Sequence, residues 1–328
     1  ASRLPTTTVC TRHRTYLLHT CPGCAQPFRA SRHGLLRPTG NSPLCGNPLG
    51  TRRHCSTDLT TLRPPRCDED CLHRQHRYDA ALETGTTAVL GEQVTLELGG
   101  KSPHILFGDA DLETAAGVIA TTMVQNAGQT CSAGSRVLVE RGAYDRVVED
   151  LAARFSKLTA GTPEMDLELG PVINARQKKR IEGFFERAET AGVPVLAQGR
   201  IAEGVPAGGY FIAPRIYGPV PRANELATLE VFGPVLSVLP FDDEADAVRL
   251  ANGTDYGLMA AVWSHDGNRA LRVSRQIKAG QVYINAFGAG GGIELPFGGV
   301  KKSGHGREKG FEALYEFSAL KTLVIKHD

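Results

Sequence analysis

The chain has 328 residues and a formal net charge of +2, but its charges are unevenly distributed. Residues 1–80 contain 12 Arg, no Lys, 4 Asp and 1 Glu, a balance of +7, so the remaining 248 residues carry 25 basic and 30 acidic groups, a balance of −5. The length allows two domains of ordinary size. No apolar run approaches the roughly 18 residues of a membrane-spanning helix, and the N-terminus lacks the apolar stretch of a secretory signal. We therefore expect a cytoplasmic protein with no membrane partner.

Residues 1–93 form an Arg-, Pro- and Cys-rich segment that we expect to be poorly folded. Within residues 1–80 there is no Ile, no Met and one Val, but there are 8 Pro and 7 of the chain's 8 Cys. So few branched apolar side chains bury too little surface to offset the entropy lost on ordering the chain. GC-rich coding DNA translated out of frame would produce the same bias. Translating the other two frames of the gene tests that hypothesis.

Two binding functions compete with disorder in this segment. A zinc-stabilised binding module would use ligands of the usual types, here Cys21, Cys24, Cys67, Cys71, His73 and His76. However, 42 residues separate the two halves of that set, more than a compact zinc module uses. Nucleic-acid binding is not expected, because no helical face collects the Arg residues.

From Val94 onward the sequence alternates between strand and helix patterns. A buried strand is predicted at 136–140, followed by a helix at 143–158 with apolar residues at helical spacing. The pattern then predicts a helix at Ala175–Ala191, strands at 211–217 and 235–241, a helix at 243–252, a strand at 259–264, a helix at 267–277 and a strand at 281–285. This alternation favours an α/β fold with a largely parallel sheet.

Residues 311–328 are predicted to form a C-terminal oligomerisation arm. Phe317 to Lys326 alternate between apolar and polar residues and end exposed, which is typical of an edge strand that pairs with another subunit. We expect a homodimer or a homotetramer.

Cys131 and Glu97 are the candidate catalytic residues. Cys131 lies in a run of small and polar residues, Asn126 to Ser135, where a substrate could approach and backbone N–H groups could stabilise an oxyanion. Glu97 lies 34 residues earlier, between two Leu residues and before Gly99 and Gly100. That position would expose its carboxylate in a cleft. Taken singly, a buried structural Cys and a solvent-facing strand Glu are the more common explanations.

Four motifs that occur in order favour catalytic over structural roles for Cys131 and Glu97. A fifth motif, Gly306–Gly310 (GREKG), follows them. They are Leu96–Lys101 (LELGGK), Gly128–Cys131 (GQTC), Glu230–Val235 (EVFGPV) and Pro296–Gly304 (PFGGVKKSG). In this order and spacing they resemble the aldehyde dehydrogenase superfamily, from about Val94 to the C-terminus. The resemblance implies that residues 94–310 form the catalytic domain.

The resemblance also implies a mechanism. The Cys131 thiolate would attack an aldehyde to form a thiohemiacetal, hydride transfer to NAD or NADP would leave a thioester, and Glu97 would activate the water that releases a carboxylic acid. The presence of Glu97 favours hydrolysis over transfer to a thiol such as coenzyme A. No metal ion is expected to take part.

The family's cofactor contacts map onto Gly99, Glu230 and Phe232, with Gln177 at a position that often contacts the cofactor. The Gly-rich run Gly288–Gly292 lacks the spacing of a phosphate-binding loop and is expected to form a flexible wall of the substrate entrance. Two further residues are expected to anchor the chain through salt bridges, Arg307 and Glu308.

Residues 1–93 lack the family's motifs for the adenosine and pyrophosphate parts of the cofactor. A family member without them could be a catalytically impaired fragment that serves only as a folded or oligomerising scaffold. These missing motifs would also decide between NAD and NADP.

Overall fold

The computed structural model describes Val9–Cys10, Thr15–Tyr16, 95–288 and 292–327. The chain divides into two compact units, Ala1–Ala81 and Leu82–Asp328. In the first unit, β1 (Val9–Cys10) pairs antiparallel with β2 (Thr15–Tyr16). The predictions for residues 1–93, including poor folding and the zinc ligands, otherwise lie outside the described residues.

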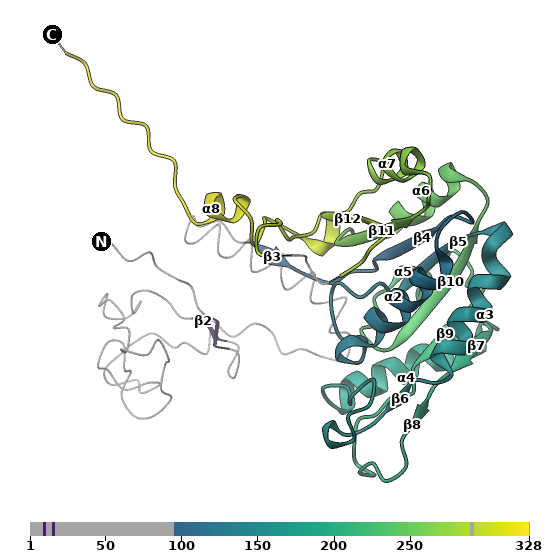
Figure 1. The fold of residues 1–328 in the computed structure, drawn as a ribbon. Helices are drawn as coiled ribbons and strands as arrows, with labels where there is room; N and C mark the ends of the chain where they lie inside the picture. The colour runs from purple at the N-terminus through teal and green to yellow at the C-terminus, as the bar shows by residue number, and fades with distance from the viewer. Residues whose placement is uncertain (1–8, 11–14, 17–94, 289–291, 328) are drawn as a thin grey trace, which may run out of the picture. The chain divides into compact units, whose positions relative to one another are not determined.

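A seven-stranded sheet forms the centre of the second unit (Figure 1). Its order is β12 (Gln281–Ile284), β11 (Met259–Trp263), β4 (Pro103–Leu106), β5 (Arg136–Glu140), β10 (Val235–Phe241), β9 (Arg215–Tyr217) and β7 (Val195–Gln198). All neighbours are parallel except the edge strand β7, which is antiparallel to β9. The predicted α/β fold with a largely parallel sheet is therefore confirmed.

Helices cover both faces of this sheet, which explains why its central strands are almost continuously apolar. On one face, α2 (Leu112–Val124) and α3 (Tyr144–Phe155) pack against Val137 and Val139 of β5. The other face, which includes Leu138, packs against α4 (Ala175–Thr190), α6 (Glu244–Asn252) and α7 (Gly267–Ser274).

The starts of the helices follow from local chemistry. An Asp or Asn side chain accepts a hydrogen bond from a backbone N–H of the first turn in each of five helices, including the short α5 (Glu225–Thr228). The capping residues are Asp111, Asn174, Asn224, Asp243 and Asp266.

Short elements complete the unit. β3 (Leu96–Glu97) pairs antiparallel with β13 (Gly304–His305), and β6 (Thr159–Ala160) pairs parallel with β8 (Arg200–Ile201). The last helix is α8 (Glu312–Glu316), and the 3-10 turns are η2 (Gln125–Gly128), η3 (Arg141–Ala143), η4 (Pro163–Met165) and η5 (Lys301–Ser303). Within the described ranges, no helix is long and apolar enough to cross a membrane.

Two of the predicted strands differ clearly from the structure. The strand predicted at 211–217 covers only Arg215–Tyr217, because Pro214 has no N–H to donate to a neighbouring strand. Residues 317–326, predicted as an edge strand, form neither helix nor strand, and all are exposed. Alternation alone does not make a strand, since its backbone needs hydrogen bonds from a neighbour. Pairing of this arm with another subunit stays a prediction.

Candidate active site

Cys131 lies in the loop between η2 and β5, where the backbone makes an unusual turn. Asn126, Ala127 and Gly128 have φ values of 50°, 54° and 71°, a left-handed conformation that side chains other than Gly rarely adopt. Position 128 also requires glycine for a second reason, because a Cβ there would overlap the Gly233 carbonyl group. Backbone strain of this kind concentrates at functional sites, and here it immediately precedes Cys131.

Glu97 is brought to the same place by the β3–β13 pair, in which it lies opposite Gly304. The backbones of Gly100 and Cys131 also lie close together, since a Cβ on Gly100 would overlap the carbonyl oxygen of Cys131. A Cβ on Gly298 would lie 3.1 Å from Glu97 Oε1. Both carboxylate oxygens of Glu97 are buried and have no hydrogen-bond partner among the described residues.

Burial therefore raises the pKa of the Glu97 carboxyl to about 7, aided by the negative charge of Glu308 and opposed by the positive charge of Arg307. The pKa of the Cys131 thiol is also raised, first by burial and then by the charges of Glu230 and Glu97. Backbone hydrogen bonds from Ser132 and Cys131 partly counter that rise. The site thus combines a half-buried thiol with a carboxyl that titrates near neutral pH.

Glu230 also lies near the thiol and is almost fully buried, with 5% of its surface exposed. Its Oε1 accepts a hydrogen bond from the Gly100 N–H (2.9 Å), and its carboxylate lies where a Cβ on Gly99 would be. Burial raises the pKa of Glu230 to about 7, while the Gly100 N–H, Arg180 and Lys101 act in the opposite direction. The sequence-predicted residues Gly99, Glu230, Cys131 and Glu97 therefore lie together.

The segment from Glu230 to Phe232 is held by α4. Gln177 Nε2 donates to the Phe232 carbonyl oxygen (2.7 Å), and Arg180 donates to the carbonyl oxygens of Val231 (2.5 Å) and Glu230 (2.8 Å). These bonds fix Phe232 at a positive φ of 57°. Gln177 thus supports this loop, and its expected contact with the cofactor stays a prediction. Sequence reasoning missed Arg180, although it lies one helical turn after Gln177 on the same helix face.

Two buried cations next to the site were also missed. Lys101 is 1% exposed, its Nζ has no hydrogen-bond partner among the described residues, and burial lowers its pKa to about 7. Arg136 donates to the carbonyl oxygens of Lys101 (3.0 Å), Leu250 (3.0 Å) and Ala251 (3.0 Å). It thereby joins the segment after Gly100 to the C-terminal end of α6. Lys101 directly follows the LELGG motif, which was the available signal.

The salt bridges expected of Arg307 and Glu308 are not found within the described ranges. Instead, Arg307 Nη1 donates to the carbonyl oxygens of Gly299 (3.1 Å) and Gly306 (2.6 Å). The backbone of Glu308 pairs with that of Phe297. Part of the Gly288–Gly292 run lies outside the described residues. Where the structure describes the chain, no group of three or more His, Cys, Asp or Glu side chains could bind a metal ion.

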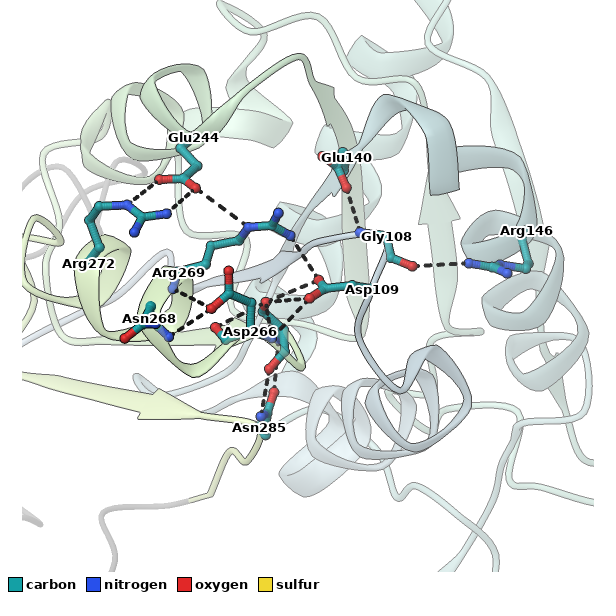
Figure 2. A network of polar contacts seen from close by, with 11 residues as sticks. Gly108, Asp109, Glu140, Arg146, Glu244, Asp266, Asn268, Arg269, Arg272 and Asn285 are labelled. Carbon is teal, nitrogen blue, oxygen red and sulfur yellow. Dashed lines mark hydrogen bonds and ion pairs between the residues drawn. The ribbon is translucent and has the colours of Figure 1, made fainter.

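A separate polar network lies near the carboxyl ends of β4 and β11 (Figure 2). Asp109 accepts hydrogen bonds from Ser264 Oγ (2.9 Å), the Asp266 N–H (3.0 Å) and Arg269 Nη1 (3.0 Å). Asn285 bridges the Ser264 backbone N–H and carbonyl oxygen. Cys131 and Glu230 instead precede β5 and β10. These contacts join the ends of the two strands and the start of α7, and they do not include Cys131, Glu97 or Glu230.

Comparison with known proteins agrees with this geometry. The model of the aldehyde dehydrogenase family matches residues 82–323. A betaine aldehyde dehydrogenase from Rhizobium leguminosarum is 38% identical over 235 residues, 71% of this chain and 48% of that protein. An aldehyde dehydrogenase from Emericella nidulans is 42% identical over 233 residues, 71% of this chain and 46% of that protein.

Solved structures match in the same way. A Burkholderia cenocepacia structure, assigned as an aldehyde dehydrogenase, has 52% identity and a TM-score of 0.75, covering 77% of this chain and 53% of that one. An NAD-dependent aldehyde dehydrogenase from Sinorhizobium meliloti has 38% identity and a TM-score of 0.70, covering 74% and 48%. The chain thus spans about half the length of the relatives that it matches. The chain belongs to the aldehyde dehydrogenase family.

Proposed function

We propose that the chain oxidises an aldehyde to a carboxylic acid with NAD or NADP, using Cys131 as nucleophile and Glu97 as general base. One observation carries the proposal. The half-buried Cys131 thiol shares its site with Glu97, whose pKa is about 7 and whose two carboxylate oxygens are buried with no hydrogen-bond partner among the described residues. A carboxylate with a pKa near neutrality is an efficient proton acceptor at physiological pH.

The reaction begins at the Cys131 sulfur. Its thiolate forms a bond to the aldehyde carbon, and the carbonyl oxygen becomes an oxyanion that backbone N–H groups of the loop can stabilise. The resting thiol is protonated, because its pKa is raised. The thiol therefore loses its proton to solvent water before attack, which leaves the Glu97 carboxylate free to act in the later hydrolysis step.

Loss of hydride from the thiohemiacetal leaves a thioester on Cys131. The nicotinamide cofactor supplies the hydride acceptor when bound. Glu97 then takes a proton from water, the resulting hydroxide attacks the thioester carbon, and the Cys131 thiolate leaves. The presence of this base favours hydrolysis over transfer of the acyl group to another thiol.

The nicotinamide end of the cofactor fits the residues present. Gly99 has no side chain between its backbone and the Glu230 carboxylate. Among the described residues that carboxylate accepts a single hydrogen bond, and it can accept more from ribose hydroxyls. Phe232 is held beside it by the α4 contacts. We assign Gly99, Glu230 and Phe232 to cofactor binding, whereas the described residues do not include the family's motifs for the adenosine end.

Activity is tested by following NAD(P)H absorbance with a panel of aldehydes. Betaine aldehyde belongs in the panel because several relatives carry that name. Cys131→Ala is the control, since it removes the thiol and leaves the loop intact. Cofactor reduction by the original chain and none by Cys131→Ala is the expected result. Equal signals from both proteins would reject the enzymatic function and favour the impaired scaffold.

We further propose that the chain forms a homodimer or homotetramer through residues 311–328. This arm exposes large apolar side chains, which single chains rarely leave in water: Phe311, Leu314, Tyr315, Phe317, Leu320, Leu323, Val324 and Ile325. Light scattering after size-exclusion chromatography should give a multiple of the 35.2 kDa chain mass. Deleting the arm should give a monomer, and an oligomer that survives the deletion would contradict the proposal.

A further inference from the structure

A buried histidine that the proposed chemistry does not use lies against the nucleophile loop. His104 is on β4, opposite Val137 of β5, and is fully buried. Its Nδ1 accepts a hydrogen bond from Trp263 Nε1 (3.3 Å), and its ring centroid lies 4.4 Å from that of Phe287. Phe287 precedes the Gly-rich segment that we expect at the substrate entrance. His104 therefore contacts both the core of the sheet and Phe287.

The Trp263 bond fixes the protonation of the ring. Because Nδ1 accepts, the proton of the neutral imidazole is on Nε2. Burial lowers the pKa of His104 to about 3, so the ring stays neutral at physiological pH. Nε2 has no hydrogen-bond partner among the described residues. An unpaired buried N–H lowers the free energy of unfolding. If this residue only filled the core, an apolar side chain would therefore be more favourable at this position.

The unpaired Nε2 edge lies directly against Gly134, three residues after Cys131. A Cβ on Gly134 would overlap Nε2, with the neighbouring ring carbons also in contact. The residues around it, Ser132 to Ser135, are small and largely buried. They give the loop no bulky side chain of its own with which to fix its position on the sheet.

We propose that His104 is a positioning residue, whose ring supports the loop at Gly134 and thereby sets the exposure and reactivity of the Cys131 thiol. The inference rests on the proposed function in taking Cys131 as the nucleophile. The ring would also transmit the position of Phe287 to this loop, which links the entrance segment to the nucleophile.

A double-mutant cycle tests the contact directly in the full chain. Gly134→Ala, His104→Ala and the double variant are compared by the rate at which iodoacetamide alkylates Cys131, measured on the Cys131 peptide by mass spectrometry. With His104 present, Gly134→Ala should change that rate by about tenfold, because the new methyl group displaces the loop. In the His104→Ala background the same change should be less than about twofold, because the ring is gone.

Ile105→Ala is the matched control. Ile105 follows His104 on β4 and is also fully buried, but it packs on the opposite face of the sheet, the face that includes Leu138. It should lower the thermal midpoint without changing the alkylation rate. The proposal is overturned if Gly134→Ala has the same effect in both backgrounds, or if Ile105→Ala alters alkylation as much as His104→Ala does.

His104→Leu gives an independent readout if Gly134→Ala does not fold. It keeps a bulky side chain and should still change the Cys131 alkylation rate by at least about threefold, with a smaller loss of thermal stability than Ile105→Ala. An unchanged rate contradicts the proposal. Alkylation needs neither aldehyde nor cofactor, so coupling without cofactor reduction would reject only the proposed function. Reduction without coupling would reject only the role of His104.

Discussion

Replacing Glu97 by Gln removes a carboxylate that the folded chain holds in an unfavourable environment. Both oxygens are buried without hydrogen-bond partners, and Glu308 adds a second negative charge nearby. The charged form is therefore destabilised in the folded state, which is why the pKa of Glu97 rises from 4.5 to about 7. Gln has nearly the same shape but no charge. The substitution should stabilise the protein at the pH at which the enzyme would work.

The sign follows from proton binding. Between pH 4.5 and about 7 the folded chain keeps a proton on Glu97 that the unfolded chain has lost, so the original chain loses stability as the pH rises through this window. A shift of this size corresponds to about 3 kcal/mol in a fully buried group. Because Glu97 is only half-buried, solvent screening reduces the effect to about 1–2 kcal/mol. Glu97→Gln does not undergo this loss.

Urea unfolding of both proteins at about pH 5 and about pH 8 measures the effect. Fluorescence of the chain's single Trp, the buried Trp263, reports on the folded unit. The free energy of unfolding of Glu97→Gln, relative to the original chain, should rise by about 1–2 kcal/mol between the two pH values. A difference that stays constant or falls would refute the buried, unpartnered state of Glu97.

Three further substitutions test the surrounding structure, each by urea unfolding. Ala127→Gly should raise the free energy of unfolding by about 0.5–1 kcal/mol by relieving a positive φ, whereas Ala116→Gly inside α2 should lower it by about 1 kcal/mol; a loss at Ala127 would contradict the strain. Arg136→Met should lower it by about 3–5 kcal/mol, because three buried carbonyl groups lose their donor, and a neutral result would contradict that anchoring role. Asp109→Asn should lower it by about 1–2 kcal/mol by weakening its bonds to Ser264 and Arg269; an unchanged value would show that the network in Figure 2 adds little stability.

Regular elements could be predicted where the apolar pattern and the end signals agreed. The strand at 235–241 and the start of the helix at Ala175 match the structure, since both are bounded by clear polar or cap residues. The edge strand β7 was missed because its residues are partly exposed and do not alternate cleanly. The C-terminal arm alternates as a strand does, yet the structure has no strand there, and its pairing with another subunit stays a prediction.

The residues of the site could be predicted only as a set of motifs. Spacing along the chain indicated that Glu97, Cys131 and Glu230 belong together, and their mutual electrostatic effects place them in one site. The supporting residues were not predictable in this way. Arg180 and His104 contact segments distant in sequence, and such contacts depend on the packing of the sheet rather than on local pattern.

The most direct test of the roles assigned to Cys131 and Glu97 is to trap the thioester. Glu97→Gln is mixed with an aldehyde and NAD or NADP, quenched in acid and analysed by mass spectrometry of the Cys131 peptide. The proposed mechanism predicts a mass increase equal to the acyl group on Cys131, one equivalent of reduced cofactor, and turnover lowered by about 10²–10⁴-fold. Steady turnover by Glu97→Gln at the original rate, or an acyl group bound at any other residue, would contradict it.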